Sequence, residues 1–149
     1  MRLSRASIFA LAGLLSVGAA AAVFADTPLS ADQVVSARQA AMKLDGRALR
    51  GADNFTGDKA VAALTTVHEN YTKLPSLFPE GSATDKSLAL PTIWQQFDEF
   101  TGIFKTGADA AADGIAAAKA GNMDKYRADV KVIAETCNTC HATFRSKLN

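Results

Sequence analysis

Residues 137–141 read Cys-Asn-Thr-Cys-His, and Cys140 lies nine residues before the last residue of the chain. The surrounding residues, from about Met123 to Lys147, have the apolar spacing of a helix, with Tyr126, Val130, Ile133, Cys137, Cys140 and Phe144 on one face. Side chains three and four positions apart on a helix lie on the same side, with Cβ atoms roughly 5–6 Å apart. The spacing therefore predicts that both thiols and the His141 imidazole project from one face of the last helix.

Cys-x-x-Cys-His is the attachment signal of a c-type haem. Cys137 and Cys140 can each form a thioether with one vinyl group, and His141 then points at the iron as the proximal axial ligand. Three other interpretations fit less well. A disulfide would close a very small loop, a thioredoxin-type pair needs a βαβ context, and a zinc site needs further ligands when only His68 remains. We predict one covalently attached haem c.

The rest of the chain predicts three further helices and almost no strand. The first helix begins at Ser30, where Ser30 and Gln33 form a capping-box pattern, and it runs to about Arg50. The second covers about 58–73, and the third begins at Pro91 and ends near Gly121. Prolines and a glycine forbid a continuous helix between the second and the third. The expected fold is all-α, an antiparallel four-helix bundle.

Apolar side chains mark the inner faces of these helices. The predicted core faces are Val35, Met42 and Leu49, with Val34 and Ala41 beside them; Val61, Leu64, Val67 and Tyr71; and Ile93, Phe97, Phe100, Phe104, Ala108, Ala111, Ile115 and Ala118. Trp94 is expected in the core or against the long connection. His68 is expected at the boundary of the protein, and Met123 far from the iron.

The first 25 residues have the features of a secretory signal peptide. Arg2 and Arg5 precede a short apolar run that ends in small residues, and nothing later in the sequence resembles a membrane span. We predict cleavage after Ala25 and a single domain over residues 26–149, without a membrane anchor, in the periplasm. Cleavage removes two of the 16 Lys and Arg and none of the 15 Asp and Glu, which leaves a net charge of about −1. That balance argues against nucleic acid as a partner.

The position of the haem motif resembles the class II cytochromes c, which include cytochrome c′. That family places Cys-x-x-Cys-His on the last helix of a four-helix bundle and follows it with an aromatic and a basic residue, here Phe144 and Arg145. The similarity extends over the whole chain after residue 25. It includes Arg38-Gln39 in the first helix and Pro91-Thr92-Ile93-Trp94 at the start of the third.

The resemblance makes residue 42 the position that decides the chemistry. Low-spin members, such as those of the c-556 type, place a methionine there as the second axial ligand, and this chain has Met42. Gly46, one turn later, leaves space for a flat haem. The alternative is that Met42 only fills the core, and that a five-coordinate, high-spin iron binds nitric oxide or carbon monoxide. The resemblance also implies that Arg38 and Gln39 contact the haem propionates; otherwise they are an ordinary surface pair.

The favoured function is electron transfer, because ligation by histidine and methionine raises the haem potential. The rival function is gas binding. An enzyme such as a peroxidase is disfavoured, since no second histidine is placed for acid–base work. The partners would be redox proteins that the sequence does not identify. The resemblance implies either a homodimer through the first two helices or a monomer.

Overall fold

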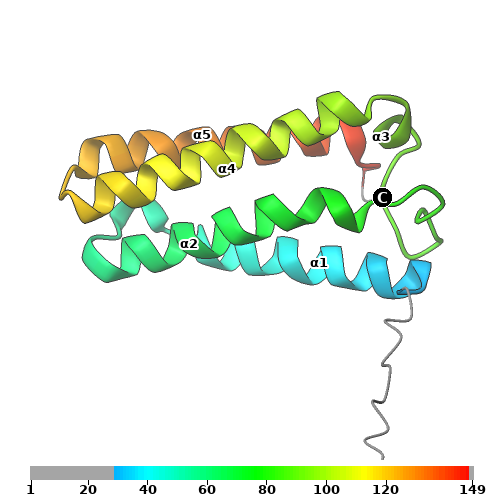
Figure 1. Ribbon diagram of the computed structural model, residues 1–149, viewed down its shortest axis with the longest axis horizontal. Helices are drawn as coiled ribbons and strands as arrows, with labels where there is room; N and C mark the ends of the chain where they lie inside the picture. Colours follow the sequence, from blue (N-terminus) through cyan, green and yellow to red (C-terminus); the bar gives the residue numbers. More distant parts are fainter. Residues whose placement is uncertain (1–28, 148–149) are drawn as a thin grey trace, which may run out of the picture.

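The computed structural model describes residues 29–147, and the predicted signal peptide lies outside them. Five α-helices follow in order: α1 (Ala31–Ala48), α2 (Gly57–Lys73), α3 (Thr92–Gln95), α4 (Phe97–Lys119) and α5 (Met123–Phe144). Two short 3-10 helices, η1 (Ala52–Asn54) and η2 (Leu74–Leu77), follow α1 and α2. The long helices α1, α2, α4 and α5 form the predicted four-helix bundle, in which α4 and α5 lie along one side and α1 and α2 along the other (Figure 1).

The start of α1 matches the predicted capping box. The Ser30 hydroxyl accepts a hydrogen bond from the Gln33 backbone N–H at 3.3 Å, and the Gln33 side chain accepts one from the Ser30 N–H at 2.8 Å. The helix ends at Ala48, about two residues earlier than predicted. Gly51 follows with a φ of 72°, a conformation that glycine adopts without steric cost, and directly precedes η1.

The core lies mainly between α2, α4 and α5. Its largest fully buried side chains are Tyr126, Phe100, Phe144, Leu64, Leu74, Ile93, Ile133, Val35 and Val67. The Phe100 ring is at the centre of an aromatic cluster, with edge-on contacts to the rings of Phe78, Phe104 and Phe144 at centroid distances of 4.7–5.4 Å. Most of the predicted core faces are confirmed by this packing.

The predicted continuous third helix is wrong, because the backbone breaks at Gln96. Its φ of −129° and ψ of 45° separate the four-residue α3 from α4. The break lets Ile93 turn into the core and lets the Trp94 indole donate a hydrogen bond to the Phe78 carbonyl at 3.0 Å. Phe97 then loses the inward orientation predicted for it and is 39% exposed. Tertiary contacts of α3 thus outweigh the continuity of the helix.

The last helix also ends earlier than predicted, at Phe144 instead of Lys147. Arg145 is extended and forms an isolated antiparallel bridge with Ala89. The Leu90 N–H donates to the Phe144 carbonyl at 3.0 Å, and the Ser146 N–H donates to the Leu88 carbonyl at 2.8 Å. Pairing with this distant segment replaces the last helical turn, and it brings the end of α5 next to α3 (Figure 1).

Candidate functional site

The haem motif lies in the last two turns of α5. Cys140 is buried, whereas Cys137 and His141 are half-buried, and both cysteines are free thiols. The helix presents these side chains toward α1, where Met42 is half-buried. The structure therefore brings together the attachment residues and the side chain predicted to lie on the other side of the iron.

Two adjoining cavities separate α5 from α1. The larger, of about 460 Å³, is lined by Arg38, Gln39, Met42, Lys43, Phe78, Ser87, Leu88, Ala89, Ile93, Phe100, Cys140, His141, Phe144 and Arg145. The smaller, of about 220 Å³, is lined by Met42, Asp45, Gly46, Leu49, Tyr71, Leu74, Ile103, Phe104, Thr136, Cys137, Cys140 and His141. Because Met42, Cys140 and His141 line both cavities, one bound group can occupy both.

The walls suit a large, flat, apolar group that carries two carboxylates. Aromatic and aliphatic side chains form most of the lining of both cavities. A Cβ added at Gly46 would have no neighbour within 4 Å, so the space predicted beside this residue is present. The larger cavity is lined by three cations, Arg38, Lys43 and Arg145, and by no carboxylate of residues 29–147. Apolar walls, with cations that line the larger cavity and not the smaller, fit the ring and the propionates of a haem.

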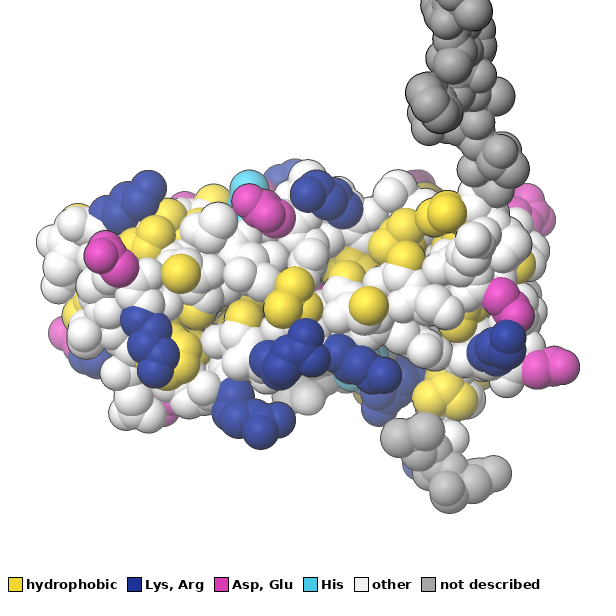
Figure 2. Space-filling model, turned by 90° about the horizontal axis from the view of Figure 1, so that it is seen from below, with side chains coloured by type: hydrophobic (Ala, Val, Ile, Leu, Met, Phe, Trp, Pro, Cys, Tyr) yellow, Lys and Arg dark blue, Asp and Glu magenta, His cyan; other side chains and the backbone are white. Residues whose placement is uncertain are grey.

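The surface around α1 and α2 carries positive charge along one edge (Figure 2), as the lining of the larger cavity does. Figure 2 views the bundle from the side of these two helices, and Lys and Arg side chains gather there in a band. Lys43, Arg47 and Arg50 of α1 and its C-terminal end are all exposed. Of these three, Lys43 lines the larger cavity, where its charge would balance the negative charge of propionates.

The protonation states at the motif suit ligation. Burial, helped by the positive charge of Arg145, lowers the pKa of His141, so the imidazole is neutral near pH 7 and keeps a nitrogen lone pair for a metal. Burial raises the pKa of the Cys140 thiol to about 11, and the neighbouring Cys137 adds to this effect. Arg145 lines the larger cavity together with His141 and Cys140.

A buried polar group lies in the wall of the smaller cavity, and the sequence analysis did not identify it. Asp45 is 4% exposed, and its Oδ1 accepts a hydrogen bond from the Asn70 amide at 2.6 Å. Its Oδ2 has no partner among residues 29–147. The Tyr71 hydroxyl is hydrogen-bonded to the Cys137 sulfur at 2.9 Å. Asp45 is three residues after Met42, so helical spacing from Met42 could have indicated its position.

Arg38 and Gln39 line the larger cavity, and both are hydrogen-bonded to the connection that precedes α3. Arg38 is only 3% exposed, which excludes an ordinary surface residue. Its guanidinium donates to acceptors on Leu77, Ser82 and Ser87, and the Gln39 amide donates to the Lys86 carbonyl. A contact of either residue with the propionates stays a prediction.

Other residues considered at the sequence level lie elsewhere. His68 and Met123 are half-buried, and neither lines either cavity. Trp94 packs against the long connection, as one interpretation held. Four phenylalanines line the cavities, Phe78, Phe100 and Phe144 the larger and Phe104 the smaller, whereas Phe97 lines neither.

A helical bundle whose last helix presents Cys-x-x-Cys-His to an apolar cavity defines a c-type cytochrome. The Cytochrome C′ family matches residues 31–145, and the chain belongs to this family. Like its members, it carries covalently bound haem c, and it is a haem protein of the electron-carrier class. Among the residues that the structure describes, none of the helices is long and apolar enough to cross a membrane.

Relatives bear both names used for this family. A cytochrome c-556 of Agrobacterium tumefaciens (strain B2A) is 34% identical over 76% of this chain and 97% of its own length. A cytochrome c′ of Rhodopseudomonas palustris is 29% identical over 94% and 96%. The crystal structure of cytochrome c′ from Thermochromatium tepidum has the same fold, with a TM-score of 0.75 and 20% identity over 80% of this chain and all of its own.

Proposed function

We propose that this chain is a periplasmic electron carrier whose single haem is low-spin, with His141 as the proximal and Met42 as the distal axial ligand. The observation that carries the proposal is that the Met42 side chain, from α1, lines both cavities together with His141, from α5. Thioether sulfur is a soft ligand, and histidine–methionine pairs raise the haem potential.

Different residues of the chain would attach the haem, ligate its iron and compensate its charge. Haem, when bound, supplies an iron that accepts and returns one electron. Cys137 and Cys140 hold the group through two thioethers, and the neutral His141 imidazole offers its lone pair. The apolar walls keep water away, so little solvent has to rearrange when the charge at the site changes. Lys43 and Arg145 line the larger cavity together with Arg38 and Gln39, and their positive charges would compensate the propionates.

The decisive experiment compares two methionines. The full chain is expressed with haem-maturation machinery, and its absorption spectrum is recorded for the wild type, Met42→Ala and Met123→Ala. Met123 is also half-buried but lies outside both cavities. We expect a low-spin spectrum that is lost only in Met42→Ala. A high-spin wild type that binds carbon monoxide readily would instead establish the second candidate, a five-coordinate gas-binding protein.

The second candidate is kept because of one observation about relatives. The cytochrome c′ of Rhodopseudomonas palustris aligns with nearly the whole chain, although the relatives named c-556 are more similar in sequence. Gas binding would need an open site on the Met42 side of the iron. The same set of spectra distinguishes this possibility from electron transfer.

Attachment and export have tests of their own. Denatured, matured protein should keep haem on Cys137 and Cys140, and the double Cys→Ser variant should lose it; a bare polypeptide mass for the wild type would refute the attachment.

The N-terminal sequence of the protein from a periplasmic fraction should begin near Asp26, and a retained Met1 would contradict cleavage. Sedimentation would distinguish a homodimer from a monomer.

A further inference from the structure

The two helices that would supply axial ligands are held in different layers of the bundle. α5 packs chiefly against α4, whereas α1 packs against α2 and η2. Between α1 and the end of α5 lies the larger cavity, which is bordered by Phe78, Ser87, Leu88 and Ala89. These four residues belong to the connection between η2 and α3, residues 78–90, which we name the 78–90 loop. The loop lies at the end of the bundle where α3 and the end of α5 meet (Figure 1).

The buried Arg38 side chain joins α1 to this loop and to the end of η2 through four hydrogen bonds. Its Nη1 donates to the Leu77 carbonyl at 3.2 Å and to the Ser82 hydroxyl at 3.0 Å. Its Nη2 donates to the Ser82 carbonyl at 2.9 Å and to the Ser87 hydroxyl at 2.6 Å. Each Nη carries two hydrogens, so these four bonds use all of them. The guanidinium carbon also lies 4.4 Å from the centre of the Phe78 ring.

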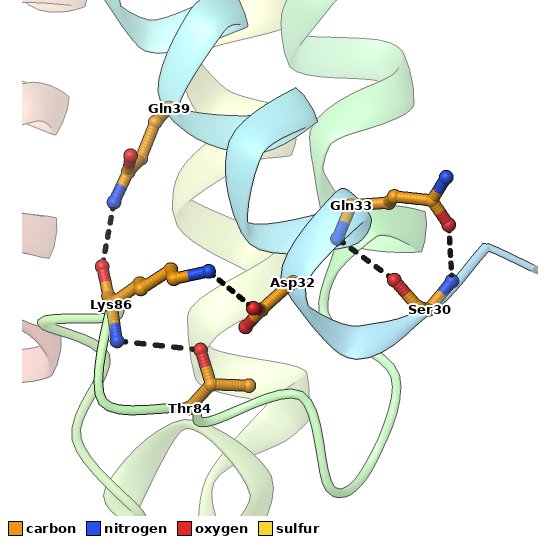
Figure 3. Close-up of polar contacts among 6 residues, drawn as sticks. All are labelled: Ser30, Asp32, Gln33, Gln39, Thr84 and Lys86. Atoms are coloured by element: carbon orange, nitrogen blue, oxygen red, sulfur yellow. Dashed lines mark hydrogen bonds and ion pairs between the residues drawn. The ribbon is translucent and has the colours of Figure 1, made fainter.

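A second, exposed connection lies beside the first. The Gln39 amide donates to the Lys86 carbonyl at 2.9 Å, and the Lys86 ammonium pairs with Asp32 at 2.5 Å (Figure 3). Both side chains of the Lys86–Asp32 pair are exposed, so the pair contributes little to stability. The buried Arg38 bonds are therefore the main attachment of the loop to α1.

The other side of the loop is bonded to the end of α5. The Leu90 N–H donates to the Phe144 carbonyl, the Ser146 N–H donates to the Leu88 carbonyl, and Ala89 forms a bridge with Arg145. These contacts begin three residues after His141. The loop is thus a spacer with Arg38 of α1 on one side and the His141 helix on the other.

We infer that Arg38 is a positioning residue: by holding the 78–90 loop against α1, it sets the separation between α1 and the end of α5, and so holds Met42 within reach of an iron bound by His141. The inference rests on the proposed function. Functional constellations have to be held within about 0.5 Å of their working geometry. The Nη hydrogens of Arg38 are all engaged with η2 and the loop, whereas Lys43 and Arg145, which line the same cavity, are exposed.

The test compares two variants of the haem-loaded full chain. Arg38→Met keeps an apolar stem but removes every donor, and Lys86→Met breaks only the exposed pair with Asp32. Carbon monoxide binds ferrous iron only after the distal ligand leaves. We expect Arg38→Met to speed carbon monoxide binding at least tenfold, to add a high-spin component to the spectrum, and to speed hydrogen exchange in residues 82–90. Lys86→Met should stay within twofold of the wild type, and Arg38→Lys should restore part of the effect.

The outcomes separate this inference from the proposed function. A high-spin wild type overturns the proposed function and, with it, the inference. A low-spin wild type with an unchanged spectrum and carbon monoxide rate in Arg38→Met leaves the proposed function standing and overturns the inference. Helicity and attached haem are measured in every variant, because a merely structural role would change these first. If Arg38→Met does not fold, Ser87→Ala, which removes one acceptor, should speed binding two- to threefold; no change would overturn the inference.

Discussion

The two sides of the haem cavity are held together by different forces. On the α4 side, helices approach so closely that only glycine fits: a Cβ at Gly107 would lie 2.6 Å from the Tyr71 Cδ2, and one at Gly114 would collide with Leu64. On the α1 side, polar attachments add to the burial of Val34 and Val35. These polar attachments are the Arg38 bonds to the 78–90 loop and the bond from Asn70 to Asp45.

Apolar packing on one side and hydrogen bonds on the other give the two sides of the cavity separate roles. Apolar packing spreads its stabilisation over many contacts, so the helix that carries the attachment motif does not depend on one residue. Hydrogen bonds are directional, and a few of them orient α1, which carries Met42. Attachment of haem should therefore tolerate substitutions on the α1 side that alter the state of the iron.

The largest expected effect is the loss of the aromatic cluster on the packed side. Phe100→Ala should lower the free energy of unfolding by about 3–5 kcal/mol, because Phe100 is 1% exposed and its removal leaves a cavity among three other rings. The control is Phe97→Ala, three residues earlier and 39% exposed, for which we expect less than about 1 kcal/mol. Urea unfolding of the haem-loaded proteins measures both. Equal losses would contradict the outward orientation of Phe97.

A smaller effect should follow from crowding the contact between α2 and α4. Gly107→Ala should cost about 2–3 kcal/mol, because the new Cβ meets the buried Tyr71 ring and the Thr136 hydroxyl. Gly102→Ala, on the exposed side of the same helix, has open space around its Cβ and should stabilise the protein by about 0.5–1 kcal/mol. Thermal and urea unfolding would show the two changes. A neutral Gly107→Ala would mean that the helices can separate without cost.

The smallest of the three effects concerns the polar side and depends on pH. Burial raises the pKa of Asp45 from 3.8 to about 6, although the Asn70 bond opposes the shift. The folded state then holds a proton that the unfolded state releases, so stability falls as the pH rises from about 4 through 6. Asp45→Asn should abolish this loss and be more stable than the wild type by about 2 kcal/mol at pH 7.5. Parallel pH profiles of unfolding for the two proteins would refute the prediction.

Most of the helices and the attachment motif could be predicted because they depend on neighbours in the sequence. Ser30 and Gln33 begin α1 through bonds three residues apart, and Cys137, Cys140 and His141 share a face through helical spacing alone. The class II resemblance likewise directed attention to Met42. For these features the relevant interactions span four residues or fewer.

The features that only the tertiary structure decided depend on contacts with residues far away in the chain. Arg38 is bonded to residues 39 to 49 positions later, so its neighbours on α1 carry no sign of its burial. The break at Gln96 and the end of α5 at Phe144 both follow from contacts with the 78–90 loop. Helical periodicity describes which side chains share a face but not which distant groups compete for them. The haem motif was therefore evident in the sequence, whereas the arrangement that presents Met42 to it depends on the fold.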